Sequence, residues 1–169
     1  MNTFFGDNYK MPTTGNYMRL GEGNNKFRIL SSAITGWIYF TTENKPIRSA
    51  TPFDETPGIK HDGKINHFWS FVVYNVEADK VQVLEISQKS IQEQMKSYLD
   101  DKEWGVPNAG EPFGYDFNIV RKGTGKMDTE YKVITSPHKP IASEIVDRYK
   151  KMDINLSALY EGKDPFKSE

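Results

Sequence analysis

Residues 66–87 read NHFWSFVVYNVEADKVQVLEIS, a pattern typical of two apolar strands joined by a polar turn. The first strand is predicted over Phe68–Asn75 and the second over Lys80–Ser87, with a short turn between them. The residues that follow, Gln88–Leu99, place apolar side chains at helical spacing. The block therefore predicts a β-hairpin that leads directly into an amphipathic helix.

Strand-like alternation flanks this block on both sides. It covers Lys26–Thr42 before the hairpin, where Gly36 predicts a bulge or bend in one long strand, and a second hairpin over Tyr115–Ile134 after the helix. Three strands, a helix and two strands form the β-β-β-α-β-β order of a five-stranded OB barrel, so we predict a mainly β chain with this fold. The predicted organisation is an N-terminal arm over 1–24, an OB-fold nucleic-acid-binding domain over 25–140 and a C-terminal helical extension over 141–169.

Composition narrows the classes of protein further. The 169 residues suit one domain, and 13% aromatic residues is a high fraction for a chain with 27% charged residues. The absence of cysteine excludes disulfides and thiolate metal sites. No apolar run is long enough to span a bilayer and no signal peptide is evident, so we expect a cytoplasmic protein without membrane contact. With a net charge of -1, any polyanion binding must depend on locally segregated positive charge.

Aromatic and basic residues are interleaved on the predicted strands. A protein that binds single strands without sequence preference stacks bases on aromatic rings while Lys and Arg contact the phosphates. For each ring the alternative is a place in the core, and for each cation it is a solvated surface. The candidate nucleic-acid contacts are Lys26, Arg28, Trp37, Tyr39, Lys45, Arg48, Trp69, Tyr74, Arg121, Lys122 and Lys132.

Catalysis is a poor fit to this sequence. The three histidines, His61, His67 and His138, have no partner at metal-ligand spacing, and no nucleophile elbow, P-loop or paired-carboxylate motif is present. We therefore expect a protein that is not an enzyme and that needs no metal or cofactor.

Several ordered blocks resemble a family of phage-encoded single-stranded DNA-binding proteins with an OB core. They are KFRILS (26–31), TGWIYF (35–40), NKPIRS (44–49), HFWSFVVYN (67–75), LEISQKSI (84–91), YDFNIVRKG (115–123), TEYKV (129–133) and SPHKP (136–140). The resemblance implies a helix-destabilising protein of phage DNA replication and recombination that coats single-stranded DNA in the host cytoplasm. It also implies contacts with replication or recombination proteins and is compatible with a homo-oligomer. Unlike some members of this wider class, the chain has no cysteines for a zinc module and no acidic tail.

Two other functions stay open at this point. A structural or protein-interaction OB barrel of a phage is favoured by the near-neutral charge. A single-stranded RNA-binding OB module has the same sequence features, because contact with the 2′-hydroxyl depends on the detail of the pocket.

Overall fold

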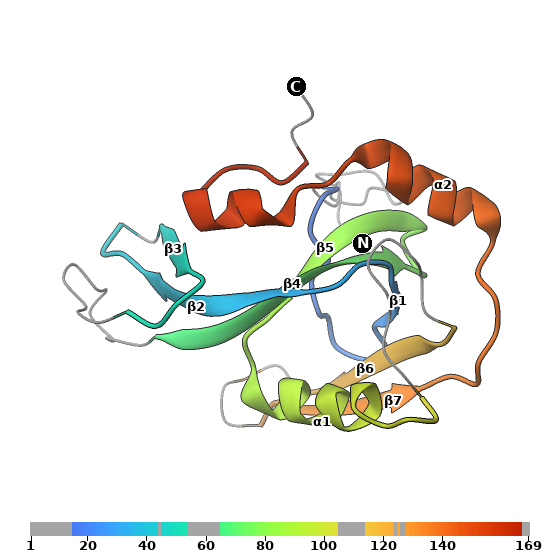
Figure 1. The fold of residues 1–169 in the computed structure, drawn as a ribbon. Coiled ribbons are helices and arrows are strands. Elements are labelled where there is room, and N and C mark those ends of the chain that lie inside the picture. The colour runs from blue at the N-terminus through green and yellow to red at the C-terminus, as the bar shows by residue number, and fades with distance from the viewer. Residues whose placement is uncertain are drawn as a thin grey trace, which may run out of the picture.

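In the part of the chain that the structure describes, a single antiparallel sheet of seven strands, which is not closed, dominates and carries two α-helices (Figure 1). The computed structural model describes residues 15–43, 45–53, 65–104, 114–123, 125 and 128–166. In chain order the elements are β1 (Lys26–Ile29), β2 (Ile34–Phe40), β3 (Pro46–Ser49), β4 (Asn66–Asn75), β5 (Lys80–Ile86), α1 (Lys89–Leu99), β6 (Asp116–Lys122), β7 (Glu130–Thr135), α2 (Ser143–Met152) and the 3-10 helix η1 (Leu156–Glu161).

Strand β4 organises the sheet. It pairs with β5 along one edge, and along the other edge with β1 near its end and with β2 near its beginning. β1 also pairs with β6, which pairs with β7, and β2 also pairs with β3. The long first strand predicted from the sequence is therefore two strands that share one edge of β4 and are separated by residues 30–33. The pairing of β2 with β4 is continuous through Gly36, so no bulge interrupts the ladder at this residue.

The prediction of a mainly β chain is confirmed, whereas a closed five-stranded barrel is not, because the sheet of the described residues has seven strands and is open. In the described part of the chain β5 and β7 do not pair with each other. The Val83 backbone on β5 bonds instead to residues of the N-terminal segment, accepting from Met18 N and donating to Asn16 O at 2.9 Å each. On β7, the side-chain amide of Gln94 from α1 donates to Tyr131 O and accepts from Val133 N, both at 2.9 Å. These bonds satisfy strand edges that would otherwise need a neighbouring strand.

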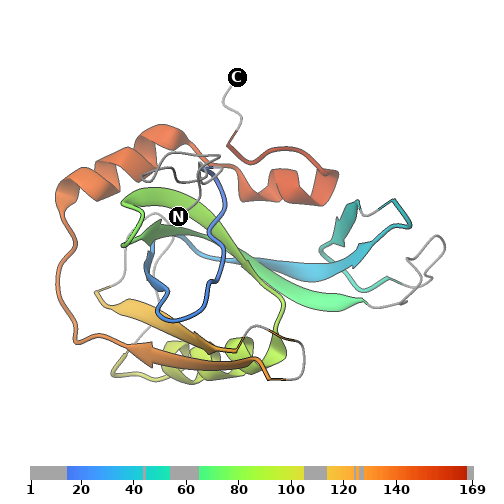
Figure 2. The ribbon, with the colours of Figure 1, turned by 180° about the vertical axis from the view of Figure 1, so that it is seen from behind.

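Two apolar clusters hold the layers together. The larger lies between the inner face of the sheet and α1, and the smaller lies on the opposite face of β4 and β5, under the C-terminal residues. Figures 1 and 2 show α2 and η1 on one side of these strands and α1 on the other, beside β6 and β7. The inner cluster includes Phe27, Ile29, Phe71, Leu84, Ile86, Ile91, Met95, Phe117 and Ile119, and the outer cluster joins Leu30, Val72, Val81 and Val83 to Ile141, Tyr149, Met152, Leu156 and Phe166.

Polar contacts fix the C-terminal extension at both of its ends. Arg148 of α2 donates to the Oδ1 of Asp79 at 3.1 Å and to its backbone carbonyl at 2.9 Å. Tyr160 of η1 donates to the backbone carbonyl of Thr35 at 2.6 Å. Asp79 lies in the β4–β5 turn with φ of 54°, and the hydrogen bond from Tyr74, followed by that from Arg148, lowers the pKa of its carboxyl. The extension thus packs as part of the fold across the outer face of β4 and β5.

Because Tyr115 is buried, we expect the free energy of unfolding to fall at alkaline pH. Burial, with smaller effects from Asp101 and Tyr98, raises the pKa of Tyr115 to about 12. An unfolded tyrosine titrates near pH ~10, so this contribution is complete below that pH and is lost as the pH rises toward 12. At its limit the loss is about 2.7 kcal/mol of unfolding free energy. Urea unfolding at pH 8, 10 and 11 measures it, and Tyr115→Phe should show a shallower decline than the wild type; equal declines would contradict the assignment.

Candidate nucleic-acid interface

Arg28, predicted as a phosphate contact, belongs to the interior. Only 2% of its surface is exposed, and its Nε donates to the Oδ1 of Asp116 at 2.6 Å. Strand pairing sets Arg28 directly opposite Asp116 on β6 and Tyr74 on β4. Its charge is therefore used to bind a carboxylate of the same chain, and Arg28 does not serve as a surface contact.

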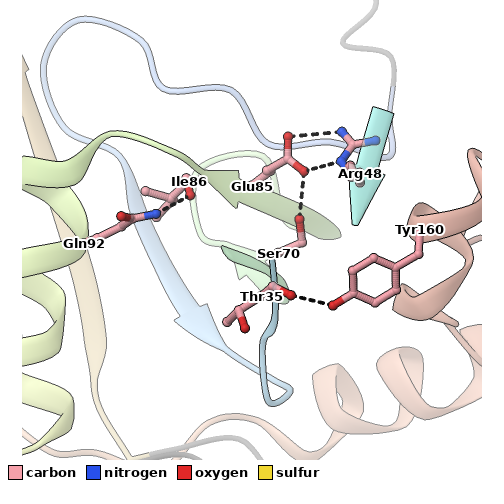
Figure 3. A network of polar contacts seen from close by, with 7 residues as sticks. All are labelled: Thr35, Arg48, Ser70, Glu85, Ile86, Gln92 and Tyr160. Atoms are coloured by element: carbon pink, nitrogen blue, oxygen red, sulfur yellow. Dashed lines mark hydrogen bonds and ion pairs between the residues drawn. The ribbon is translucent and has the colours of Figure 1, made fainter. Parts of the chain in front are cut away.

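Arg48 is likewise engaged within the molecule. Its guanidinium forms two hydrogen bonds to the Glu85 carboxylate, at 2.8 and 3.1 Å, and its side chain is 13% exposed. Ser70 donates to the same carboxylate at 3.0 Å, and Figure 3 shows this network beside the bond from Tyr160 to Thr35. A bidentate pair of this kind leaves little of the guanidinium for a ligand.

These contacts lie on the face of β4 and β5 that α2 and η1 cover. Tyr74, another predicted contact, points to this side, where its ring packs against the outer cluster and its hydroxyl donates to Asp79 at 2.7 Å. Here the C-terminal extension occupies that face, so the structure gives no support to Arg48 and Tyr74 as ligand contacts.

A set of aromatic side chains lies on the opposite face, where β2, β3 and the first half of β4 extend from one end of the molecule (Figure 1). We define the aromatic ledge as Trp37, Tyr39, His67 and Trp69. Trp37 is paired with His67 across β2 and β4, and their rings lie 5.1 Å apart between centroids. Tyr39 is two residues further along β2 and contacts Phe53 edge-on at 4.9 Å. Trp37, Tyr39 and Trp69 are partly buried and His67 is exposed, so rings on this face remain accessible.

The first turns of α1 support the ledge. The side-chain amide of Gln92 is buried and donates to the backbone carbonyls of His67, at 3.0 Å, and Ile86, at 2.9 Å. Trp69 packs partly against the inner cluster, and beside it an apolar recess of about 200 Å³ opens between residues 31–33 and α1. The ledge therefore continues from the partly buried rings on β2 and the exposed ring of His67 on β4 into a recess at the core.

The other predicted cations are distributed over separate places. Lys45 is exposed at the turn before β3, close to the end of the ledge. Arg121 donates to the backbone carbonyl of Leu20 at 3.0 Å, and its buried Nε has no hydrogen-bond partner among the residues that the structure describes. Lys26, Lys122 and Lys132 are exposed on β1, β6 and β7. The structure thus brings together Trp37, Tyr39 and Trp69, with Lys45 nearby, and leaves the remaining lysines on another surface.

Two residues near the aromatic ledge or near the exposed lysines were not predicted from the sequence. His67 is not among the predicted contacts, yet it is exposed and pairs with Trp37. Its position opposite Trp37 follows from the strand register, which one sequence does not reveal. Lys139 was given no role, although it lies 3.8 Å from Asp116. The signal for Lys139 was its place four residues after the end of β7, near the basic residues of that hairpin.

Among the described residues no group of three or more His, Cys, Asp or Glu side chains is arranged to hold a metal ion. No helix in the same part of the chain is both long and apolar enough to cross a membrane. No protein-family model matches the chain, and neither the curated proteins nor the solved structures include one with significant similarity to it.

Proposed function

We propose that the protein binds single-stranded DNA without sequence preference, with bases stacking on the aromatic ledge. The observation that carries the proposal is the placement of Trp37, Tyr39, His67 and Trp69 on one accessible sheet face. Each base that stacks on an aromatic side chain contributes about 1 to 3 kcal/mol, whatever its identity. Two or three such contacts are enough for useful affinity when cations hold the backbone.

The spacing of the rings suits an extended strand. Trp37 and Tyr39 are two residues apart on β2, which corresponds to about 7 Å along a strand. His67 is on the neighbouring strand, roughly 5 Å to the side. A folded duplex hides the faces of its bases, whereas a single strand can place successive bases on these rings. The arrangement therefore favours single-stranded over double-stranded nucleic acid.

We further propose that the sheet is an elaborated, open form of the OB fold. Taken together, β1 and β2 correspond to its first strand, β4 and β5 to the second and third, and β6 and β7 to the fourth and fifth. The support is the pairing of β1 with both β4 and β6, together with the position of α1 between β5 and β6. The OB fold is a partly open barrel even in its ordinary five-stranded form. Under this proposal the action in phage DNA replication and recombination implied by the resemblance remains the expected context.

Replacing Trp37 by alanine tests the proposal. We expect binding of an unstructured oligothymidine to weaken by about 1 to 3 kcal/mol, because one stacking platform is lost. Titration followed by fluorescence anisotropy of a labelled oligonucleotide measures the change, with duplex DNA of equal length for comparison. Trp104→Phe is the matched control, because Trp104 packs against Tyr115 and His138 and is not part of the ledge.

Intact near-ultraviolet circular dichroism must accompany the result. Unchanged affinity in a folded Trp37→Ala protein would refute the role of the ledge. Equal affinity for a matched RNA strand would favour the RNA-binding alternative. Absence of binding to either strand by the wild-type protein would favour a protein-interaction role.

A further inference from the structure

Four exposed lysines lie on or next to the outer side of β1, β6 and β7, apart from the ledge. We define the lysine face as Lys26, Lys122, Lys132 and Lys139. Strand register sets Lys26 beside Asn118 and Asn118 beside Ile134, with Lys132 one step further along β7. Two strand spacings and one two-residue step separate Lys26 from Lys132, a distance of about 12 Å. The positive charges are therefore spread over a surface much longer than the separation of the two groups in one ion pair.

The acidic groups on this side do not cancel the lysines. Asp116 is 14% exposed, and it already contacts Arg28 at 2.6 Å and Lys139 at 3.8 Å. Glu130, on β7, lies directly opposite Lys122 of β6 in the strand register. Lys26 and Lys132 form none of the ion pairs found in the described residues. A chain with a net charge of -1 therefore concentrates positive charge on this side of the sheet.

One end of the lysine face is hollowed. A cavity of about 260 Å³ lies between Lys26 and Lys139, and its polar lining comprises Asn118, Thr135, Ser136 and the carboxylate of Asp116, which contacts Arg28 and Lys139. Val76 and Ile134, each 38% exposed, supply apolar walls. Ammonium, hydroxyl and amide groups are donors for phosphate oxygens, and short aliphatic walls suit the sugar of a nucleotide.

We propose that the lysine face binds the phosphate backbone of the DNA strand independently of its bases. Flexible lysines act as point charges that follow a polyanion, whereas recognition of an acidic protein commonly uses aromatic or arginine anchors. The described residues of this face include no exposed aromatic side chain and no exposed arginine. The inference rests on the proposed function in one respect, namely that the polyanion is the same strand that stacks on the ledge.

Linear polyphosphate separates the two surfaces, because it has charges but no bases. The test compares Lys26→Gln/Lys132→Gln with Lys150→Gln/Lys151→Gln, which removes the same charge from exposed positions of α2. We expect polyphosphate to bind the wild type, the α2 variant and Trp37→Ala, and to bind the β1/β7 variant much more weakly.

Salt dependence with oligothymidine provides the second readout. Removing two phosphate contacts should reduce the slope of log affinity against log salt by about 1.4. Between 50 and 200 mM salt, the advantage of the wild type over the Lys26→Gln/Lys132→Gln variant should therefore shrink about sevenfold. The Lys150→Gln/Lys151→Gln variant should keep the wild-type slope.

The outcomes distinguish this inference from the proposed function. If oligothymidine binding depends on Trp37 but both lysine variants behave alike, the lysine face is refuted and the ledge stands. If polyphosphate binding depends on Lys26 and Lys132 while oligothymidine binding does not, the DNA assignment is overturned in favour of an acidic partner. If oligothymidine does not bind at all, the proposed function fails, and with it the assignment of this face to DNA, whatever polyphosphate does.

Discussion

Replacing Asp116 by alanine is expected to lower the free energy of unfolding by about 3 to 5 kcal/mol. The substitution leaves the guanidinium of Arg28, only 2% exposed, without the carboxylate that its Nε contacts at 2.6 Å. A charge that remains buried after its partner is removed cannot recover the hydration it lost on folding. Urea unfolding followed by tryptophan fluorescence measures the loss.

Replacing Arg28, the other partner of this ion pair, should lower the free energy of unfolding by less. Arg28→Met leaves Asp116, which is 14% exposed and has Lys139 at 3.8 Å, so its carboxylate keeps some water and a second cation. We expect about 1 to 3 kcal/mol for this variant. Asp100→Ala is the matched control, because Asp100 forms an exposed i,i+4 pair with Lys96 and should cost no more than about 0.5 kcal/mol. Equal costs for Asp116→Ala and Asp100→Ala would contradict the account.

Local periodicity was sufficient to predict the centre of the fold. The predicted strands Phe68–Asn75 and Lys80–Ser87 match β4 and β5, and the predicted helix Gln88–Leu99 matches α1. Their patterns arise within short windows, because each element has one face toward the core. Strand β3 was not predicted, since its four residues, Pro46–Ser49, are few and are held by pairing with β2.

The open edges could not be predicted for a related reason. They are satisfied by contacts between residues far apart in the chain, such as Asn16 with Val83 and Gln94 with Val133. Neither contact changes the spacing of apolar residues in the sequence. The barrel prediction followed from element order alone, and element order does not specify what covers each edge.

The candidate site was predicted in composition but not in arrangement. Strand alternation alone puts Trp37 and Tyr39, two residues apart on β2, on one face. The same alternation sets Arg28 on the face opposite Phe27 and Ile29, and Arg28 does point away from the inner core. Its partner Asp116, however, is 88 residues away, and burial beside it depends on how β1 and β6 pair. A single sequence predicts to which side of a strand a residue points. Whether other elements bury that side depends on how distant parts of the chain pack, and alternation does not predict this.

Replacing Gly36 by alanine is expected to destabilise the protein by about 3 kcal/mol, at the upper end of the range for overpacking. A Cβ at this position would lie 2.2 Å from the backbone oxygen of Ser49 and 3.1 Å from Cε1 of Phe68. The carbonyl belongs to β3, which cannot move aside without losing its pairing with β2. Alanine would otherwise stabilise by about 0.4 to 1 kcal/mol through the unfolded chain, so the steric effect dominates.

Gly21→Ala provides the control for Gly36→Ala, because nothing in the described part of the chain lies within 4 Å of the Cβ it would add. Its free energy of unfolding should stay within about 0.5 kcal/mol of the wild type. Ser49 is paired with Trp37, so displacement of β3 in Gly36→Ala should also change the tryptophan emission and, under the proposed function, weaken oligothymidine binding. A Gly36→Ala protein with wild-type stability would show that β3 is not held against β2 as described. Loss of stability with unchanged DNA affinity would instead separate β3 from the ledge, because Trp37 and His67 would then keep their arrangement without it.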